Sequence, residues 1–343
     1  MLFEGLDEIV AALPIPSFVV DVSARIKLAN APARTLFGDD FIDRNYITRL
    51  RQPALVSAIE TCARDGTRVV TKYTLSGQGT DRIYEATVSR LELGRAVLVC
   101  LEDKTPMHEA GMMRRDFVAN VSHELRTPLT ALLGFIDTLR GPARNDSVAI
   151  ERFLGMMARE AQRMNRLVGD LLSLSRVEFS ERQVPHARVR LSEVLAAARS
   201  SIAEQPDRDR IVFDPPTFPE ADVTGDADQL RQVFNNLLEN ALKYGRAGSK
   251  VTVSLSEGDS DIYLRCPFYQ VSVQDEGEGI AQHHIPRLTE RFYRVDDHRS
   301  RELGGTGLGL AIVKHIIHRH RGRLDVTSTK GVGSRFSVIL RKL

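Results

Sequence analysis

The spacing of apolar residues predicts a long helix from Thr105 to about Arg140. Apolar side chains recur every three or four positions along it, at residues 117, 121, 125, 129, 132, 136 and 139, which is the period of one helix face. Thr105 supplies an N-cap hydroxyl, and Pro106 occupies the first helical position, where its missing amide proton costs little. Gly141-Pro142 then ends the helix.

A second helix is predicted from about residue 148 to 178, after the capping run Asn145–Ser147. Its apolar residues alternate spacings of three and four, which is the a/d seam of a coiled coil or helical bundle. Residues 104–182 are therefore predicted to form an αα-hairpin. Because a lone hairpin cannot fully bury both apolar stripes, we expect a homodimer in which two hairpins form a four-helix bundle.

Residues 1–103 alternate short strand and helix patterns. Strand runs begin at Ser17 and Ile26, and Asn30–Gly38 is a short helix pattern that ends at a glycine. Further strands begin near Arg68 and Arg95. This order, with the Asn…Leu-Phe-Gly run, resembles a PAS sensory domain and implies a PAS-like α/β module. A ligand pocket and a spacer or dimerisation module without ligand both remain open.

Residues 188–343 alternate helices and strands again, after a predicted linker at Val184–Arg188. Helices are expected over 191–202, 226–244 and 308–320, and strands over 250–256, 261–265, 270–274, 323–328 and 334–340. The stretch 257–269 is longer than a strand connection needs, and Pro267 would interrupt a central strand. The sequence assigns this stretch no function. The whole chain is predicted to be a multidomain α+β protein.

Composition narrows the function classes. With 343 residues the chain can hold two or three domains, and its net charge of +2 disfavours nucleic acid as a partner. The basic run His315–Arg323 is interpreted as cations at a helix C-terminus. Three well-separated cysteines argue against a disulfide framework or a zinc site and favour a reducing compartment.

The sequence contains no apolar run near the ~20 residues of a membrane-spanning helix. The first residues are acidic, whereas a signal peptide begins with basic ones. We therefore expect a cytoplasmic location. Contact with the inner face of a membrane would require an upstream segment or a partner protein.

The segment Phe117–Phe135 places His123 beside Glu124, one turn before Pro128. Proline cannot donate a hydrogen bond to the carbonyl four residues back, which is that of Glu124. We expect the helix to bend just after His123 and to leave a backbone acceptor free beside the imidazole. Such an imidazole, which is largely neutral near pH 7, is suited to act as a nucleophile.

The predicted helix 226–244 carries polar groups on one face. Asn236 and Asn240 are four residues apart, and Lys243 follows one turn later. Amide oxygens are hard ligands that suit Mg²⁺, and a lysine beside them suits phosphate. A merely solvated face is the alternative. It is disfavoured because the opposite face already carries a full apolar stripe and asparagine adds no helix propensity.

Two glycine-containing segments complete the candidate chemistry. Asp275 follows a strand and precedes Gly277 and Gly279, which permit a tight turn and a close backbone approach to a ligand. Gly304–Gly309 leads into an apolar helix, where backbone amides and the helix dipole favour an anion. Each segment alone could be an ordinary turn or loop.

Together and in this order, these segments resemble the H, N, G1 and G2 boxes of the sensor histidine kinases of two-component systems. Arg291–Arg294 lies where that family has its F box, and Gly333–Phe336 matches its terminal strand. The resemblance covers about residues 107–343 and implies a Bergerat-type α/β sandwich for the ATP-binding domain. Pro286–Asp296, with Arg301–Gly305, looks most like the phosphate-regulon sensor kinases.

The resemblance implies a role for each matching residue. His123 would accept the γ-phosphoryl group of ATP, Glu124 would orient the imidazole and remove its proton, and Thr127 would position a phosphatase water. Asn240 would ligate Mg²⁺, and Asp275 would read the adenine amino group. The other ATP contacts would come from Asn236, Lys243, Tyr244, Gly277, Gly279, Ile280, Tyr293, Arg294, Gly305, Thr306, Gly307, Leu308 and Gly309.

The expected function is autophosphorylation of His123 and transfer to an aspartate of a response regulator. The family resemblance also implies phosphatase activity toward that regulator, and the narrower resemblance implies phosphate-starvation sensing. The first alternative is another ATPase of the same nucleotide fold, of the chaperone or topoisomerase type. The second is a sensory scaffold that binds ATP without transferring its phosphate. The sequence does not determine the stimulus or the partner regulator. It also does not determine whether phosphorylation occurs within or between protomers.

Overall fold

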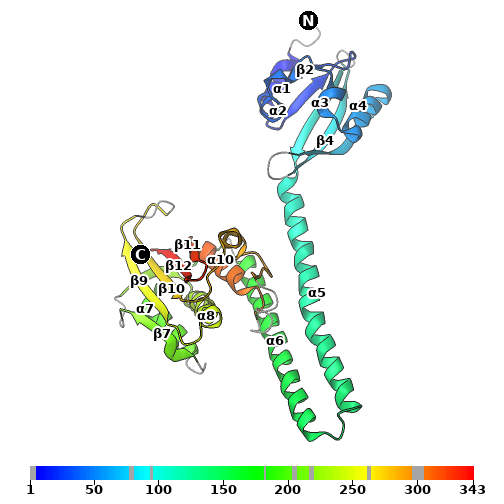
Figure 1. Ribbon diagram of the computed structural model, residues 1–343. Coiled ribbons are helices and arrows are strands. Elements are labelled where there is room, and N and C mark those ends of the chain that lie inside the picture. The colour runs from blue at the N-terminus through cyan, green and yellow to red at the C-terminus, as the bar shows by residue number, and fades with distance from the viewer. Residues whose placement is uncertain are drawn as a thin grey trace. The chain divides into compact units, whose positions relative to one another are not determined.

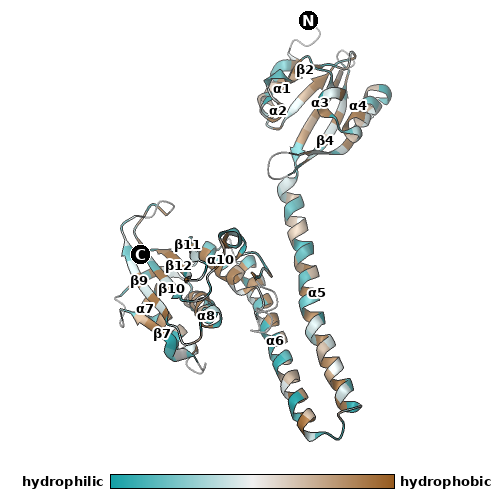
Figure 2. Ribbon diagram, in the orientation of Figure 1, coloured by the Kyte–Doolittle hydropathy of each residue, from teal (hydrophilic) through white to brown (hydrophobic). Residues whose placement is uncertain are grey.

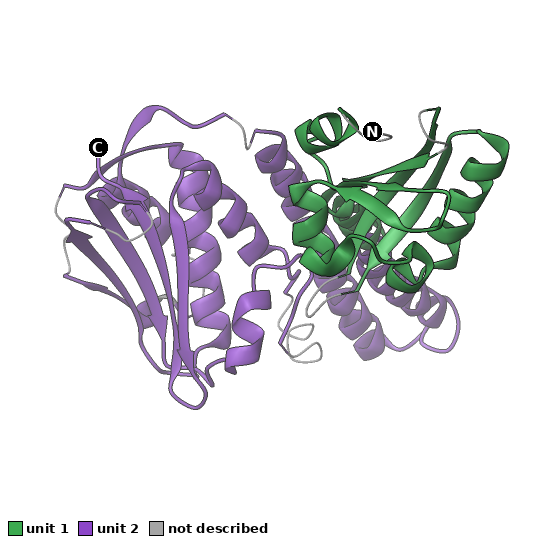
Figure 3. Cartoon of the chain, turned by 90° about the horizontal axis from the view of Figure 1, so that it is seen from above, with its two compact units in different colours: residues 1–119 green, residues 120–343 purple. Residues whose placement is uncertain are grey.

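The computed structural model describes residues 5–76, 81–92, 96–180, 183–202, 207–215, 220–260, 264–295 and 305–343. The chain divides into two compact units, residues 1–119 and 120–343 (Figure 3). The helix α5 crosses this boundary, so the predicted hairpin belongs mostly to the second unit. No helix of the described ranges is long and apolar enough to cross a membrane.

The first unit is built on an antiparallel sheet with the strand order β2-β1-β5-β4-β3. Its strands are β1 (Ser17–Val20), β2 (Ile26–Ala29), β3 (Val69–Leu75), β4 (Arg82–Leu91) and β5 (Ala96–Asp103). Its helices are α1 (Leu6–Ala12), α2 (Ala31–Phe37), the 3-10 turn η1 (Asp39–Phe41), α3 (Tyr46–Leu50) and α4 (Pro53–Asp65). The predicted strands and the helix that starts after Asn30 are confirmed, whereas β4, α1, α3 and α4 were not located from the sequence.

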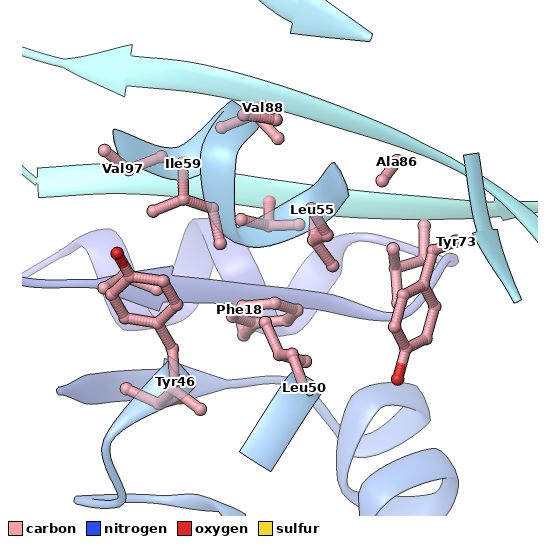
Figure 4. Packing of buried hydrophobic residues seen from close by; sticks show 14 of the residues in the cluster. Phe18, Tyr46, Leu50, Leu55, Ile59, Tyr73, Ala86, Val88 and Val97 are labelled. Atoms are coloured by element: carbon pink, nitrogen blue, oxygen red, sulfur yellow. The ribbon is translucent and has the colours of Figure 1, made fainter. Parts of the chain in front are cut away.

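Alternating side chains of β1 face two cores, because successive residues of a strand point to opposite faces. Phe18 packs in the larger core with Leu55 and Ile59 of α4, as Figure 4 shows. Val19 faces a smaller core under α1. Asn30 joins these parts, because its Oδ1 accepts from both the Ser17 amide (3.0 Å) and the Ala33 amide at the start of α2 (3.0 Å).

The hairpin consists of α5 (Thr105–Arg140) and α6 (Ser147–Phe179) (Figure 1). Asp146 caps α6 by accepting from the amides of residues 148 and 149 at 3.0 Å. The prediction for the start of α5 was wrong in one respect. Thr105 is the first helical residue, and its hydroxyl accepts the Ile83 amide of β4 (2.9 Å) instead of capping the helix.

The helix α5 continues through Pro128 without interruption, so the proline does not divide it. The bend and the free carbonyl beside His123 stay predictions. Hydrophobic residues recur along both hairpin helices (Figure 2). Many of them are exposed in the single chain, including Leu129, Leu133, Leu154, Val168 and Leu172.

The rest of the second unit is an α/β domain. Its sheet has the order β11-β12-β10-β9-β7, antiparallel except for the parallel pair β7–β9, and a two-stranded sheet pairs β6 with β8. The strands are β6 (Ala187–Arg190), β7 (Ile211–Asp214), β8 (Asp222–Gly225), β9 (Val251–Gly258), β10 (Phe268–Asp275), β11 (Arg323–Thr329) and β12 (Gly333–Arg341). Its helices are α7 (Leu191–Ser201), η3 (Arg208–Arg210), α8 (Ala227–Tyr244), η4 (Gln282–Arg287) and α10 (Gly309–Arg319).

Helix α8 lies at the centre of this domain (Figure 1) and packs against α7, α10 and strand β10. Leu230, Val233 and Leu237 form its buried face, as their spacing predicts. Asp226 caps the helix through the Gln229 amide at 3.2 Å. This packing fixes the opposite, polar face of α8 with respect to the sheet.

Three expectations for this domain were wrong. The linker at Val184–Arg188 overlaps strand β6, which pairs with β8. Leu264 and Arg265 are outside any strand, while residues 261–263 of the same expected strand lie outside the described residues. Pro267 does not interrupt a central strand, because it precedes β10 and its carbonyl accepts the Lys342 amide (2.9 Å).

Candidate active site

A cavity of about 590 Å³ opens beside the polar face of α8. It gathers thirteen of the residues expected to contact ATP: Asn236, Asn240, Lys243, Tyr244, Asp275, Gly279, Ile280, Tyr293, Arg294, Gly305, Thr306, Gly307 and Gly309. Two expected contacts, Gly277 and Leu308, do not line the cavity. Segments separated by more than 70 residues in sequence therefore meet at one site.

The polar face of α8 extends further than the sequence prediction. Besides Asn236 and Asn240, it places Gln232, Asn235 and Glu239 along the cavity. Gln232 and Glu239 are four and three residues from Asn236, and Asn235 is three residues from Gln232 and four from Glu239, a signal that was available in the sequence. The Asn236 amide group donates to the Gly309 carbonyl (3.2 Å), so this asparagine ties α8 to the start of α10.

Asp275 lies at the end of β10 and is buried. Burial raises the pKa of its carboxyl group, while hydrogen bonds from the backbone of Gly277 and Ser334 act in the opposite direction. The Gly277 amide donates to Asp275 Oδ1 at 2.8 Å. A Cβ at Gly277 would lie 2.3 Å from the Tyr244 carbonyl oxygen, which explains a glycine at a position behind the cavity wall.

The glycine loop before α10 also depends on backbone contact. Gly307 has φ +72°, and a Cβ there would lie 2.8 Å from the Cα of Phe292. The Phe292 amide donates to the Gly307 carbonyl at 2.8 Å, so this loop is joined to the expected F box. Leu308 is fully buried and anchors the loop in the domain core rather than in the cavity. Helix α10 then begins at Gly309 with its N-terminus at the cavity, which favours an anion there.

Charged groups of both signs face the cavity. Burial lowers the pKa of the Lys243 ammonium, and the cations Arg294 and Arg166 lower it further. Desolvation and the Asp170 carboxylate raise the pKa of Glu239, although this side chain reaches solvent through the open cavity. An anionic ligand would relieve the repulsion among the three cations.

Three residues of α6 that the sequence did not predict line the same cavity, namely Arg166, Gly169 and Asp170. Asp170 Oδ2 accepts from the Thr306 hydroxyl at 2.7 Å, which connects the hairpin to the glycine loop. Burial raises the pKa of the Asp170 carboxyl group, while Thr306 and Arg166 counteract that rise. On the predicted hairpin these residues were only ordinary helix positions, so no sequence signal identified them.

The expected phosphoacceptor His123 is exposed and does not line the cavity. Its neighbour Glu124 accepts from Arg163 of α6 (3.2 Å) and from Arg294 of the F-box segment (3.0 Å). The Thr127 hydroxyl donates to the His123 carbonyl at 3.2 Å. The structure thus brings Glu124, but not the His123 ring, to a residue of the cavity wall.

The cavity offers hard oxygen donors of the kind that Mg²⁺ binds. The amide oxygen of Asn235 is buried and has no hydrogen-bond partner among the described residues, and the Asn240 amide and the Glu239 carboxylate line the same wall. The described residues contain no group of three or more His, Cys, Asp or Glu that could hold a metal ion by itself. This donor set fits an ion that is bound jointly by amide oxygens, phosphate and water.

The interpretation of the basic run near residue 320 was incomplete. His320 is buried, its Nε2 accepts the Asp226 amide (2.9 Å), and its Nδ1 lies 2.7 Å from the Ile316 carbonyl. An amide can only donate, so the ring is neutral with its proton on Nδ1. Burial accordingly lowers the pKa of His320. This ring supports the first turn of α8 and is not an exposed cation.

Two family models match the chain. Residues 113–180 match the His Kinase A (phospho-acceptor) domain, and residues 225–343 match the histidine kinase-, DNA gyrase B- and HSP90-like ATPase family. The first segment contains His123 and most of the hairpin, and the second contains α8 and the remaining walls of the cavity.

Among known proteins, the phosphate regulon sensor protein PhoR of Pseudomonas aeruginosa is 40% identical over 245 residues, which cover 71% of this chain and 53% of PhoR. The sensor protein kinase WalK of Staphylococcus saprophyticus is 30% identical over 341 residues, 98% of this chain and 54% of WalK. Among solved structures, the histidine kinase ThkA in complex with the response regulator protein TrrA matches with a TM-score of 0.49 and 19% identity, and the match covers 98% of each chain.

The chain spans about half the length of these two sensor proteins. Both of the domains that the family models describe are present, and they occur in the order that the H, N and G boxes predict. The chain belongs to the sensor histidine kinases of two-component systems.

Proposed function

We propose that this protein is an ATP- and Mg²⁺-dependent histidine kinase that phosphorylates itself on His123. The observation that carries the proposal is the cavity, in which Asn240, Lys243 and Asp275 meet a glycine loop at a helix N-terminus. An exposed histidine on a separate helical hairpin supplies the acceptor. Phosphoryl transfer depends mainly on positioning and charge stabilisation, which such a site can provide.

In this mechanism an imidazole nitrogen of His123 attacks the γ-phosphorus of ATP and the bond to the leaving ADP oxygen breaks. Glu124 takes the imidazole proton. Asn240 would hold Mg²⁺, which would supply charge stabilisation for the phosphates. Asp275 accepts from the adenine amino group, and Lys243 lies against the phosphates. Because His123 does not line the cavity here, a movement between the hairpin and the ATP-binding domain must precede transfer.

Three finer assignments accompany the proposal. The phosphorylated His123 passes its phosphoryl group to an aspartate of a response regulator, and Thr127 positions a water that hydrolyses the same phosphoaspartate. The exposed apolar residues of the hairpin, such as Leu133 and Leu154, support a homodimer that covers them. The similarity to PhoR supports phosphate starvation as the signal that this protein senses.

For the first unit we propose a PAS-like sensory module. Its strand order β2-β1-β5-β4-β3, with helices between β2 and β3, supports this assignment. A cytoplasmic location, with any membrane contact made through further chain segments or partners, is part of the same proposal.

The test is incubation of the pure protein with γ-labelled ATP. Label that is stable to base, labile to acid and absent from His123→Gln is the expected result. Nucleotide affinity of the variant should be unchanged, since His123 is outside the cavity. Normal ATP affinity without any protein-bound label would contradict the kinase.

A second candidate is an ATPase of the gyrase B or HSP90 type, because the matching family model includes those proteins. It would release labelled inorganic phosphate without a labelled protein intermediate. The same incubation therefore separates the two functions.

A further inference from the structure

The carboxylate of Glu124 is held between two guanidinium groups from different parts of the chain. Arg163 Nη2 of α6 and Arg294 Nη2 of the F-box segment both donate to the same oxygen, Oε2, at 3.2 and 3.0 Å. The side chains of Glu124, Arg163 and Arg294 are 18%, 15% and 4% exposed. Ion pairs shielded to this degree are weakened little by salt and hold a side chain in a defined position.

Arg294 also belongs to the wall of the nucleotide cavity. Its Nε is buried and has no hydrogen-bond partner among the described residues. It lies near enough to Lys243 to lower the pKa of that ammonium group. The Arg294 guanidinium therefore donates to Glu124 through Nη2, while its Nε is free to donate to an anion in the cavity.

We propose that Arg294 is shared between Glu124 and the terminal phosphate of a bound nucleoside triphosphate. Without the triphosphate, Arg294 neutralises Glu124. When the phosphate reaches the cavity, Arg294 turns to it, and Glu124 keeps only its bond to Arg163. This inference rests on the proposed kinase function, in which Glu124 is the base for His123. Arg163 and Arg294 are then positioning residues for Glu124.

The exchange has a consequence that can be measured without any chemistry. If Glu124 and the terminal phosphate compete for Arg294, then Glu124 weakens triphosphate binding, because coupling between two interactions is reciprocal. A diphosphate lacks the group that competes. Removal of the Glu124 charge should therefore tighten binding of the triphosphate and leave the diphosphate nearly unaffected.

The experiment is calorimetric titration of the full chain and of Glu124→Gln with Mg²⁺ and either a non-hydrolysable ATP analogue or ADP. We expect about fivefold or greater tightening for the ATP analogue and less than about twofold change for ADP. Glutamine has the same shape as glutamate and keeps an acceptor oxygen, so the helix should remain folded. Circular dichroism of the variant verifies this.

The matched control is Glu178→Gln. Glu178 Oε1 of α6 pairs with Arg291 Nη2 at 2.5 Å, so this change removes a different ion pair between the hairpin and the ATP-binding domain without touching Glu124 of α5. It should not produce a gain that is selective for the triphosphate. An equal gain in both variants would mean that loosened packing of the hairpin explains the effect, and would overturn the proposal.

A second variant, Arg294→Lys, tests the shared residue itself. Lysine keeps one charge but cannot hold two partners in the planar geometry of a guanidinium. In this background, Glu124→Gln should no longer tighten ATP-analogue binding, and a persistent gain would exclude Arg294 as the shared group.

The proposed exchange and the proposed kinase function are contradicted by different results. Unchanged affinity in Glu124→Gln with lost autophosphorylation overturns the exchange alone, whereas a native chain that labels no histidine overturns the kinase.

Discussion

The helices that carry the two halves of the candidate chemistry differ in how their apolar faces are covered. In α8, Leu230 and Leu237 are 0% and 1% exposed, whereas in the hairpin Leu133 and Leu154 are 55% and 50% exposed. Helix α8 is enclosed by α7, α10 and the sheet of its own domain. The described walls of the cavity therefore come from a single chain, while the apolar stripe of the hairpin stays partly exposed in it.

This difference assigns different tasks to the two regions. The fixed core beneath α8 holds Asn236 and Asn240 in place at the cavity wall, which suits precise binding of a nucleotide. The hairpin presents the exposed His123 on a helix whose apolar residues are partly exposed in the single chain. A region of this kind can change its packing with its partner, whereas the core of the ATP-binding domain cannot.

The prediction with the largest expected effect tests whether the apolar residues of α8 contribute more to stability than those of the hairpin, as their different exposure indicates. Leu237→Ala should lower the free energy of unfolding of the ATP-binding domain by about 2–5 kcal/mol, because it leaves a cavity in a closed core. The matched change Leu133→Ala should have a much smaller effect in the single chain. Urea unfolding, followed by hydrogen exchange of the β10 amides, measures the first loss. Equal losses in both variants would contradict the comparison.

The second prediction separates catalysis from assembly. Asn240→Ala should reduce autophosphorylation by about 100-fold or more, because it removes the amide that we propose as a Mg²⁺ ligand at the site where charge develops. Dimerisation should be unchanged, since α8 packs within its own domain. Labelling with γ-labelled ATP and sedimentation of the same sample provide both readouts. A dimer that dissociates in this variant would show that the regions are not independent.

The third prediction concerns the hairpin alone. Leu133→Ser and Leu154→Ser should each weaken the dimer by about tenfold, since each removes roughly 1–2 kcal/mol of apolar burial from the interface. Sedimentation equilibrium measures the dissociation constant. The control is Val22→Ser in the first unit, where an equally apolar side chain is 75% exposed. If Val22→Ser weakens the dimer equally, the loss of any exposed apolar side chain is sufficient to weaken it. The apolar stripe of the hairpin would then not be the specific dimer interface.

The prediction with the smallest expected effect concerns the pH dependence of the stability of the ATP-binding domain. His320 is neutral and buried beneath the first turn of α8, and burial lowers its pKa below the ordinary value of 6.5. The unfolded chain therefore binds a proton more readily. The stabilisation that the neutral His320 ring contributes is therefore fully present above pH 6.5. It is lost as the pH falls below that value towards the lowered pKa.

The measurement is the urea midpoint of the ATP-binding domain between pH 8 and pH 5. In His320→Gln the midpoint should vary less with pH, because glutamine can also donate and accept but does not titrate in this range. His318→Gln, which changes a neighbouring histidine of the same helix, is the control. An unchanged pH profile in His320→Gln would show that another group controls acid stability.

Sequence periodicity predicted the elements whose apolar residues are regularly spaced. The hairpin, α8 and the paired strands β10 and β12 repeat their apolar positions over several turns or pairs, and they were identified with close boundaries. Strands β6, β7 and β8 have only four residues each. Unlike the equally short β1 (Ser-Phe-Val-Val), β6 and β8 contain no adjacent apolar residues and were therefore not distinguished from connecting segments.

The candidate site could be predicted where chemistry follows a local pattern, and not where it depends on tertiary contacts. Asn240, Asp275 and the glycine loop are recognisable by spacing and meet in the cavity. Asp170 reaches the site because α6 packs against α10, and Arg163 contacts Glu124 because α5 and α6 lie side by side in the hairpin. A local sequence pattern does not contain that information, and the burial of His320 is hidden for the same reason.

The attachment of α5 to the first sheet has a consequence for local opening of the molecule. The Thr105 hydroxyl accepts the Ile83 amide, and the Ile83 carbonyl accepts the Lys104 amide at 2.8 Å, so the start of the helix and the start of β4 share their hydrogen bonds. Neither can fray without exposing the other to solvent. The amides of Ile83 and of the residues at the helix start should therefore exchange with deuterium at a common rate. They form one cooperative unit across the border where a sequence-based division would separate sheet from helix.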